Sequence, residues 1–156
     1  MDVKYVNPFI QCLMNVLQTM ANYPASFKKP YLKDGDHTLG EITGFIHMKG
    51  DDVECTMAIA FSSSAMTTIA SKMIGEEITE LDNETVDLAG EITNMVTGGV
   101  KKEFAKDGLN FDLSTPEFHV GQDYCPPHLK GEKVLVVPFV SDSGEFFLEA
   151  SMHTVH

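Results

Sequence analysis

Apolar residues recur every three to four positions in three segments of the chain, as is typical of amphipathic helices. We expect Asn7 to cap the first helix and Pro8 to occupy its first position, where the missing N–H does no harm. Gly75 and Gly108 follow the second and third segments, and glycine commonly ends a helix. The pattern therefore predicts helices over about residues 8–21, 62–74 and 82–106.

The segments between these helices have the character of β-strands, with Gly- and Asp-containing breaks at residues 33–36 and 49–52. We expect two hairpins, one pairing 42–48 with 53–61 and one pairing 133–140 with 146–155 across 141–144, and strand structure over 109–120. Each half of the chain has a helix followed by about three strand segments, a loose likeness without a residue-level repeat. The order of elements predicts one α+β domain spanning residues 1–156.

The predicted third helix carries an outward polar row. At about 100° per residue and with Glu91 at zero, Asp87, Asn94 and Gly98 all fall within about 60° of it. Apolar residues fill the remaining inward arc: Leu88, Ala89, Ile92, Met95, Val96 and Val100. A solvated polar face is the ordinary alternative for such a row.

Two features favour a surface that meets a partner. Gly90, Gly98 and Gly99 each cost a helix on the order of 1 kcal/mol relative to Ala. Gly98 shares the polar row, where the lack of a side chain lets another surface approach closely; packing of the helix on a sheet is the alternative. The row also carries no Lys or Arg before Lys101.

Composition excludes several classes of function. The chain has 11 Lys and Arg against 23 Asp and Glu, a net charge of −12, which argues against binding nucleic acid or an anionic membrane. Three distant cysteines, together with no evident signal peptide or membrane span, favour a cytoplasmic protein. The one short Cys/His pair, Cys125 and His128, lacks two further ligands, so we expect no metal site and no cofactor in this chain.

The spacing Asp87-x3-Glu91-x2-Asn94-x21-Pro116 resembles the signature of the CheC, CheX and FliY chemotaxis phosphatases. The neighbouring residues 71–75 and 94–99 and the order of elements are also similar to members of that family. The resemblance implies a CheC-like fold, with helices packed on a largely antiparallel sheet and a pseudo-twofold relation between the halves.

A second copy of the motif in the first helix, Asn7-x3-Gln11-x2-Met14, lacks the Glu and the Asn. A single working motif makes the chain similar to CheX members of the family, which implies a homodimer formed through the sheets. The implied substrate is a phosphorylated CheY-type response regulator, which brings its own phosphoaspartate, Mg²⁺ and a Lys.

The resemblance and the chemistry together assign roles to the motif residues. We expect Asn94 to position the attacking water, because its neutral amide both donates and accepts hydrogen bonds. Glu91 is expected to anchor the regulator's Lys, because a carboxylate beside a phosphoryl dianion needs a cation between them. Asp87, Gly98 and Pro116 are expected at the surface that binds the regulator, with fixing the adjacent loop as the alternative for Pro116.

One other function remains open from the sequence, and a second is disfavoured. A non-catalytic adaptor could bind a response regulator or another signalling protein through the same helix. A flagellar switch component normally has extra segments, for which 156 residues leave no room.

Overall fold

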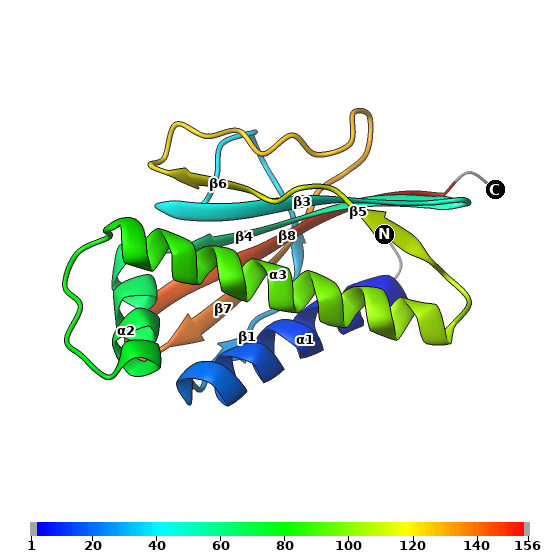
Figure 1. The fold of residues 1–156 in the computed structure, drawn as a ribbon. Helices are drawn as coiled ribbons and strands as arrows, with labels where there is room; N and C mark the ends of the chain where they lie inside the picture. The colour runs from blue at the N-terminus through cyan, green and yellow to red at the C-terminus, as the bar shows by residue number, and fades with distance from the viewer. Residues whose placement is uncertain (1–2, 155–156) are drawn as a thin grey trace.

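The computed structural model describes residues 3–154, with side chains from residue 5 onward (Figure 1). Its elements are α1 Val3–Ala21, β1 Ser26–Phe27, β2 Tyr31–Leu32, β3 Ile42–Gly50, β4 Val53–Phe61, α2 Ser63–Ile74, α3 Asn83–Lys106, β5 Phe111–Leu113, β6 Glu117–Val120, β7 Leu135–Ser141 and β8 Gly144–Thr154. The second and third predicted helices and both predicted hairpins are confirmed. The predicted end of the last strand, Val155, lies outside the described residues.

The predicted start of α1 is wrong. The helix already begins ahead of Asn7, so this residue does not cap it, and Pro8 lies inside the helix. An interior Pro loses a backbone hydrogen bond and crowds the preceding turn. Tertiary contacts hold that turn, because Val6 is 3% exposed and the ring of Tyr5 packs on Phe104 at a centroid distance of 6.2 Å. Packing against α3 therefore outweighs the local preference of Pro8.

The ends of α2 follow the local signals in the sequence. The Ser62 hydroxyl accepts a hydrogen bond from the N–H of Ala65 at 3.2 Å, which satisfies one free donor of the first turn. Gly75 adopts a left-handed conformation with φ +82°, and its N–H donates to the carbonyl of Ser71 at 2.9 Å.

All strand pairs in the described sheet are antiparallel, in the order β1-β7-β8-β4-β3-β5, with β2 also on β7 and β6 also on β3. The central strands β4 and β8 come from different halves of the chain. Each half gives its two short strands to the hairpin of the other half: β1 and β2 pair with β7, and β5 and β6 pair with β3. This reciprocal exchange has the pseudo-twofold arrangement that the family resemblance implies.

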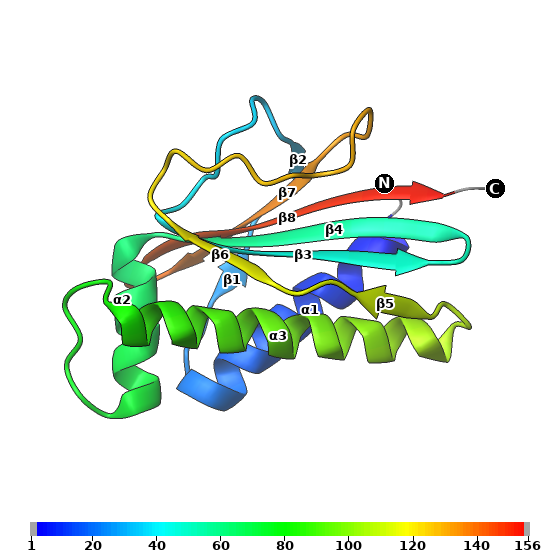
Figure 2. The same cartoon turned by 45° about the horizontal axis from the view of Figure 1, so that its top comes forward.

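The three helices cover one face of the sheet, and irregular segments over residues 33–41 and 121–134 cover the other (Figures 1 and 2). The main apolar core lies between the helices and the sheet. Its largest fully buried side chains include Phe9, Phe61, Phe104, Phe139 and Phe146. Within residues 3–154, no helix is both long enough and apolar enough to cross a membrane.

A buried polar network holds the irregular segments against the second face. The Lys33 ammonium donates to Glu149 Oε1 at 2.9 Å, and His128 Nε2 lies 3.0 Å from the same oxygen. His128 Nδ1 lies 2.6 Å from Thr56 Oγ1, which also hydrogen-bonds Ser151. Glu149 is fully buried, so these contacts compensate a charge that has no access to water.

Candidate functional site

Helix α3 begins with a reciprocal pair of hydrogen bonds. Asp82 accepts from the N–H of Thr85 at 2.9 Å, while its own N–H donates to the Thr85 hydroxyl at 2.7 Å. This pair satisfies two backbone donors of the first turn and fixes where the helix begins. Gly108, with φ +80°, follows the last turn.

The polar row predicted on α3 is exposed in the structure. Asp87, Glu91, Asn94 and Gly98 are all exposed. The opposite side of the helix is buried, including Ala89, Ile92, Val96, Val100 and Phe104. The wheel calculation therefore predicts the orientation of α3 correctly, because a broad apolar face determines which side packs on the sheet.

The side chains of Asp87, Glu91 and Asn94 have no partner within residues 5–154: no hydrogen bond or ion pair between described residues involves them. On the buried side of the helix the Thr93 hydroxyl donates to the carbonyl of Ala89 at 2.9 Å. A carboxylate and an amide are thus presented to solvent on the exposed face of α3, free to bind groups of another molecule.

Gly98 has open space beside it. A Cβ added at this position would have no described atom within 4 Å, so Gly98 does not pack the helix on the sheet. Its neighbour Gly99 does make a close contact, because a Cβ there would lie 3.1 Å from the sulfur of Cys12 on α1. The two glycines therefore differ: Gly99 allows α1 to approach, and Gly98 leaves the exposed surface flat.

Pro116 reaches the site region through β6. It is half-buried and lies directly before this strand, which pairs with β3 so that Phe118 faces Gly44. The Phe118 ring also lies against α3, where a Cβ added at Gly90 would be 3.1 Å from it. Figure 2 shows the β5–β6 segment passing alongside α3. The structure thus places the strand after Pro116 beside the turn of α3 that carries Glu91.

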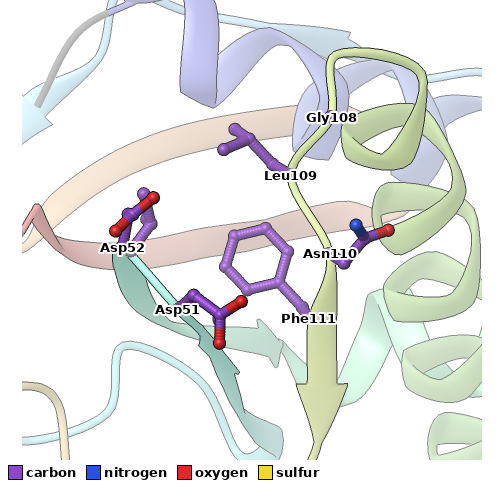
Figure 3. A pocket seen from close by; sticks show the side chains of 8 residues that line it. Asp51, Asp52, Gly108, Leu109, Asn110 and Phe111 are labelled. Atoms are coloured by element: carbon purple, nitrogen blue, oxygen red, sulfur yellow. The ribbon is translucent and has the colours of Figure 1, made fainter.

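The polar row of α3 lies on an exposed helix face and does not line the pocket near the end of α3. That pocket is lined by residues 50–53 of the β3–β4 turn and residues 108–111 after the end of α3, with Asp51 and Phe111 pointing into it (Figure 3). Its volume of about 70 Å³ admits water but no sizeable ligand. Small-molecule sites are usually concave, so an exposed row of polar groups fits a macromolecular partner better.

A metal site is not assembled by the described residues: none of their His, Cys, Asp and Glu side chains form a group of three or more that could hold an ion. His128, half of the short Cys/His pair in the sequence, instead has both ring nitrogens in the buried network with Thr56 and Glu149. The sequence carries no motif for this network, because its members come from four separate parts of the chain.

Comparisons with known proteins agree with this fold. The family model described as chemotaxis phosphatase CheX matches residues 42–140. A comparison with curated protein sequences gives no match. A CheC-like superfamily protein from Shewanella sp. PV-4 has 36% identity and a TM-score of 0.91, covering 98% of this chain and 99% of that one.

Two further solved structures carry the CheX name. The chemotaxis protein CheX from Vibrio vulnificus has 37% identity and a TM-score of 0.89, covering 96% of this chain and 99% of that one. A chain of the CheX–CheY–BeF3–Mg²⁺ complex from Borrelia burgdorferi shares the fold, with 23% identity, a TM-score of 0.80 and coverage of 96% and 97%. The family model and the near-complete match at 37% identity together show that this chain belongs to the CheX family of chemotaxis phosphatases.

Proposed function

We propose that this chain hydrolyses the aspartyl phosphate of a CheY-type response regulator, with Glu91 and Asn94 as its catalytic residues. The observation that carries the proposal is the exposed carboxylate–amide pair on α3, which has no partner within residues 5–154 of a CheX-family chain. The Borrelia burgdorferi protein of the same fold forms a complex with CheY, BeF3 and Mg²⁺, which supports a regulator as the partner here.

The reaction asks little covalent chemistry of the phosphatase. Water attacks phosphorus, the bond between phosphorus and the aspartyl oxygen breaks, and the products are inorganic phosphate and a free carboxylate. Catalysis of phosphoryl transfer depends mainly on positioning and on stabilising charge. The neutral amide of Asn94 can accept a hydrogen bond from the water and donate one to a phosphoryl oxygen without electrostatic repulsion.

Glu91 binds the regulator's Lys and does not position the water. Two like charges about 4 Å apart repel by roughly 1 to 4 kcal/mol across the range from bulk water to a protein surface. A carboxylate is therefore acceptable next to a phosphoryl group when a cation lies between them, and the regulator's Lys supplies that cation. Mg²⁺ belongs to the regulator in this scheme. Asp87 and Gly98 form the surrounding surface that meets the regulator, and Pro116 fixes the start of β6 beside it.

A homodimer formed through the sheets stays a prediction of the family resemblance. A cytoplasmic location and a single domain over residues 1–156 stay predictions from the composition and the order of elements.

A non-catalytic adaptor is the second candidate function. The observation behind it is the first copy of the motif, where Gln11 and Met14 stand on α1 in place of Glu and Asn, so a helix of this fold exists without the catalytic pair. The presence of both groups on α3 favours the phosphatase, because binding alone does not need an amide that orients water.

The deciding experiment follows the decay of an acetyl-phosphate-labelled regulator in Mg²⁺. Wild-type protein should accelerate the decay, Asn94→Ala should lose turnover while keeping affinity, and Glu91→Ala should lose both. Asn15→Ala, an exposed Asn on α1, is the matched control and should keep the wild-type rate. If the protein binds the regulators tested but accelerates the decay of none of them, the adaptor function replaces the phosphatase function.

A further inference from the structure

Two glycines bring α3 and the sheet into close contact at the candidate site. A Cβ added at Gly44 on β3 would overlap the side chain of Thr93 on α3. A Cβ added at Gly90 on α3 would lie 3.1 to 3.4 Å from three carbons of the Phe118 ring on β6. Gly44 and Phe118 are themselves register partners in the sheet. We refer to Gly44–Thr93 and Gly90–Phe118 as the two glycine contacts.

The two glycine contacts lie directly behind the proposed catalytic residues. Gly90 precedes Glu91, and Thr93 precedes Asn94. In one contact Thr93 of the helix packs on Gly44 of the sheet, and in the other Phe118 of the sheet packs on Gly90 of the helix. Together they limit the distance of this turn from the sheet and its rotation about the helix axis. Geometry of this kind matters because catalytic groups must be held to within a fraction of an ångström.

The positions related to Gly90 and Gly44 by the pseudo-twofold arrangement are not glycines. Ile10 precedes Gln11 in α1 as Gly90 precedes Glu91 in α3. Leu135 on β7 lies as far from the β7–β8 turn as Gly44 on β3 lies from the β3–β4 turn, and its register partner on β2 is Leu32. The topology therefore does not require glycine at these places, and the two glycine contacts are made by the helix that carries the Glu and the Asn.

We propose that Phe118 is a positioning residue of the phosphatase site, acting through its contact with Gly90 to set the position of the α3 turn that bears Glu91 and Asn94. The proposal rests on the proposed function. It also explains why a helix tolerates Gly90, which costs on the order of 1 kcal/mol relative to Ala. Phe118 needs the missing Cβ, and the strand that carries Phe118 begins directly after Pro116.

The test first crowds the contact between residue 90 and Phe118 and then makes room for the added atoms. Gly90→Ala places a methyl group 3.1 Å from the Phe118 ring, so the ring or the turn of α3 must give way by a few tenths of an ångström. We expect kcat for the phosphorylated regulator to fall about tenfold with KM within twofold, because such shifts act on the transition state. Gly90→Ala/Phe118→Leu, in which the shorter side chain makes room for the methyl group, should return kcat to within about threefold of wild type.

Gly99→Ala is the matched control, since it adds the same methyl group to α3 at the same 3.1 Å, but against Cys12 on α1. It should keep kcat within twofold of wild type. A folded Gly90→Ala protein with wild-type kcat, or a double variant that stays as slow as Gly90→Ala, would overturn the proposal.

A second measurement separates this inference from the proposed function. The side-chain amide resonances of Asn94, which are not joined to residue 90 by a peptide bond, should shift in Gly90→Ala, return in Gly90→Ala/Phe118→Leu and stay in place in Gly99→Ala. If wild type accelerates decay of no regulator, the proposed function fails while these resonances still decide whether Phe118 positions the turn. Unshifted resonances in Gly90→Ala would reject the positioning role.

Discussion

Glu149 offers a sharp test of how the second face of the sheet is held. Its carboxylate is fully buried and lies within hydrogen-bond distance of both Lys33, whose side chain is 3% exposed, and His128. Through these two residues it ties the segments over 33–41 and 121–134 to β8. Glu149→Gln keeps the shape and removes the charge, so the Lys33 ammonium stays buried without a counter-ion.

The expected loss of stability is large. Removing one partner of a buried ion pair costs about 3–5 kcal/mol, because the remaining charge stays away from water. A domain is stable by only about 5–15 kcal/mol in total. At about 2–4 °C of melting temperature per kcal/mol for a chain of this size, Glu149→Gln should melt roughly 10 °C lower.

The assay is urea unfolding followed by circular dichroism at neutral pH, with two comparison variants. Glu132→Gln breaks the ion pair with His153, in which both side chains are substantially exposed, and should cost less than about 1 kcal/mol. Lys33→Met/Glu149→Gln removes both charges and should recover about half of the loss of Glu149→Gln. A cost below about 1 kcal/mol for Glu149→Gln would refute the reasoning, because it would mean that Lys33 reaches water when unpaired.

Three further predictions concern reactivity, alkaline titration and the site. Cys125 is exposed and should react with a thiol reagent at pH 8 within seconds to minutes, whereas Cys55, whose pKa is raised to about 12 chiefly by burial, should react only on unfolding. Burial, with Glu117 and Glu149 nearby, raises the pKa of Tyr124 to about 12 from 10.0. The neutral Tyr124 hydroxyl therefore contributes its full stability below pH 10, and this contribution is lost as the pH rises towards 12. A titration followed by absorbance should show one tyrosine that ionises near pH 12, and this ionisation should be missing in Tyr124→Phe. Asn94→Ala should leave the free energy of unfolding in urea within about 0.5 kcal/mol of wild type, because the side chain is exposed and unpartnered among the described residues.

Local signals in the sequence predict the ends of α2 and α3 because the residues that satisfy those ends lie within a few positions of them. Gly75 ends α2 as the pattern predicts, and Ser62 and Asp82 cap α2 and α3 at the predicted starts of these helices. Pro8 misleads for the opposite reason. The turn before Pro8 is helical because it packs against α3, as in the contact of Tyr5 with Phe104. Residues so far apart in the chain do not enter a local sequence pattern.

The sequence also predicts the exposed row on α3, because one broad apolar face decides which side of the helix is buried. It places Gly98 in the exposed row but does not predict what Gly90 contacts. Only the placement of β6 brings the Phe118 ring against Gly90. The buried charge of Glu149 is hidden in the same way, since an alternating strand pattern favours solvent exposure until the irregular segments cover that face.

The two halves of the fold separate what its architecture needs from what the chemistry needs. Pro30 stands directly before β2 as Pro116 stands before β6, so both halves begin this short edge strand with a proline. Proline suits the start of an edge strand, where no ladder hydrogen bond is lost, and its presence in both halves favours a structural role for Pro116. The Glu and the Asn of α3 have no such counterpart, because α1 has Gln11 and Met14 there, and Met14 packs against the core. A helix in this position folds without the pair, so its presence on α3 is explained by the reaction we propose rather than by the fold.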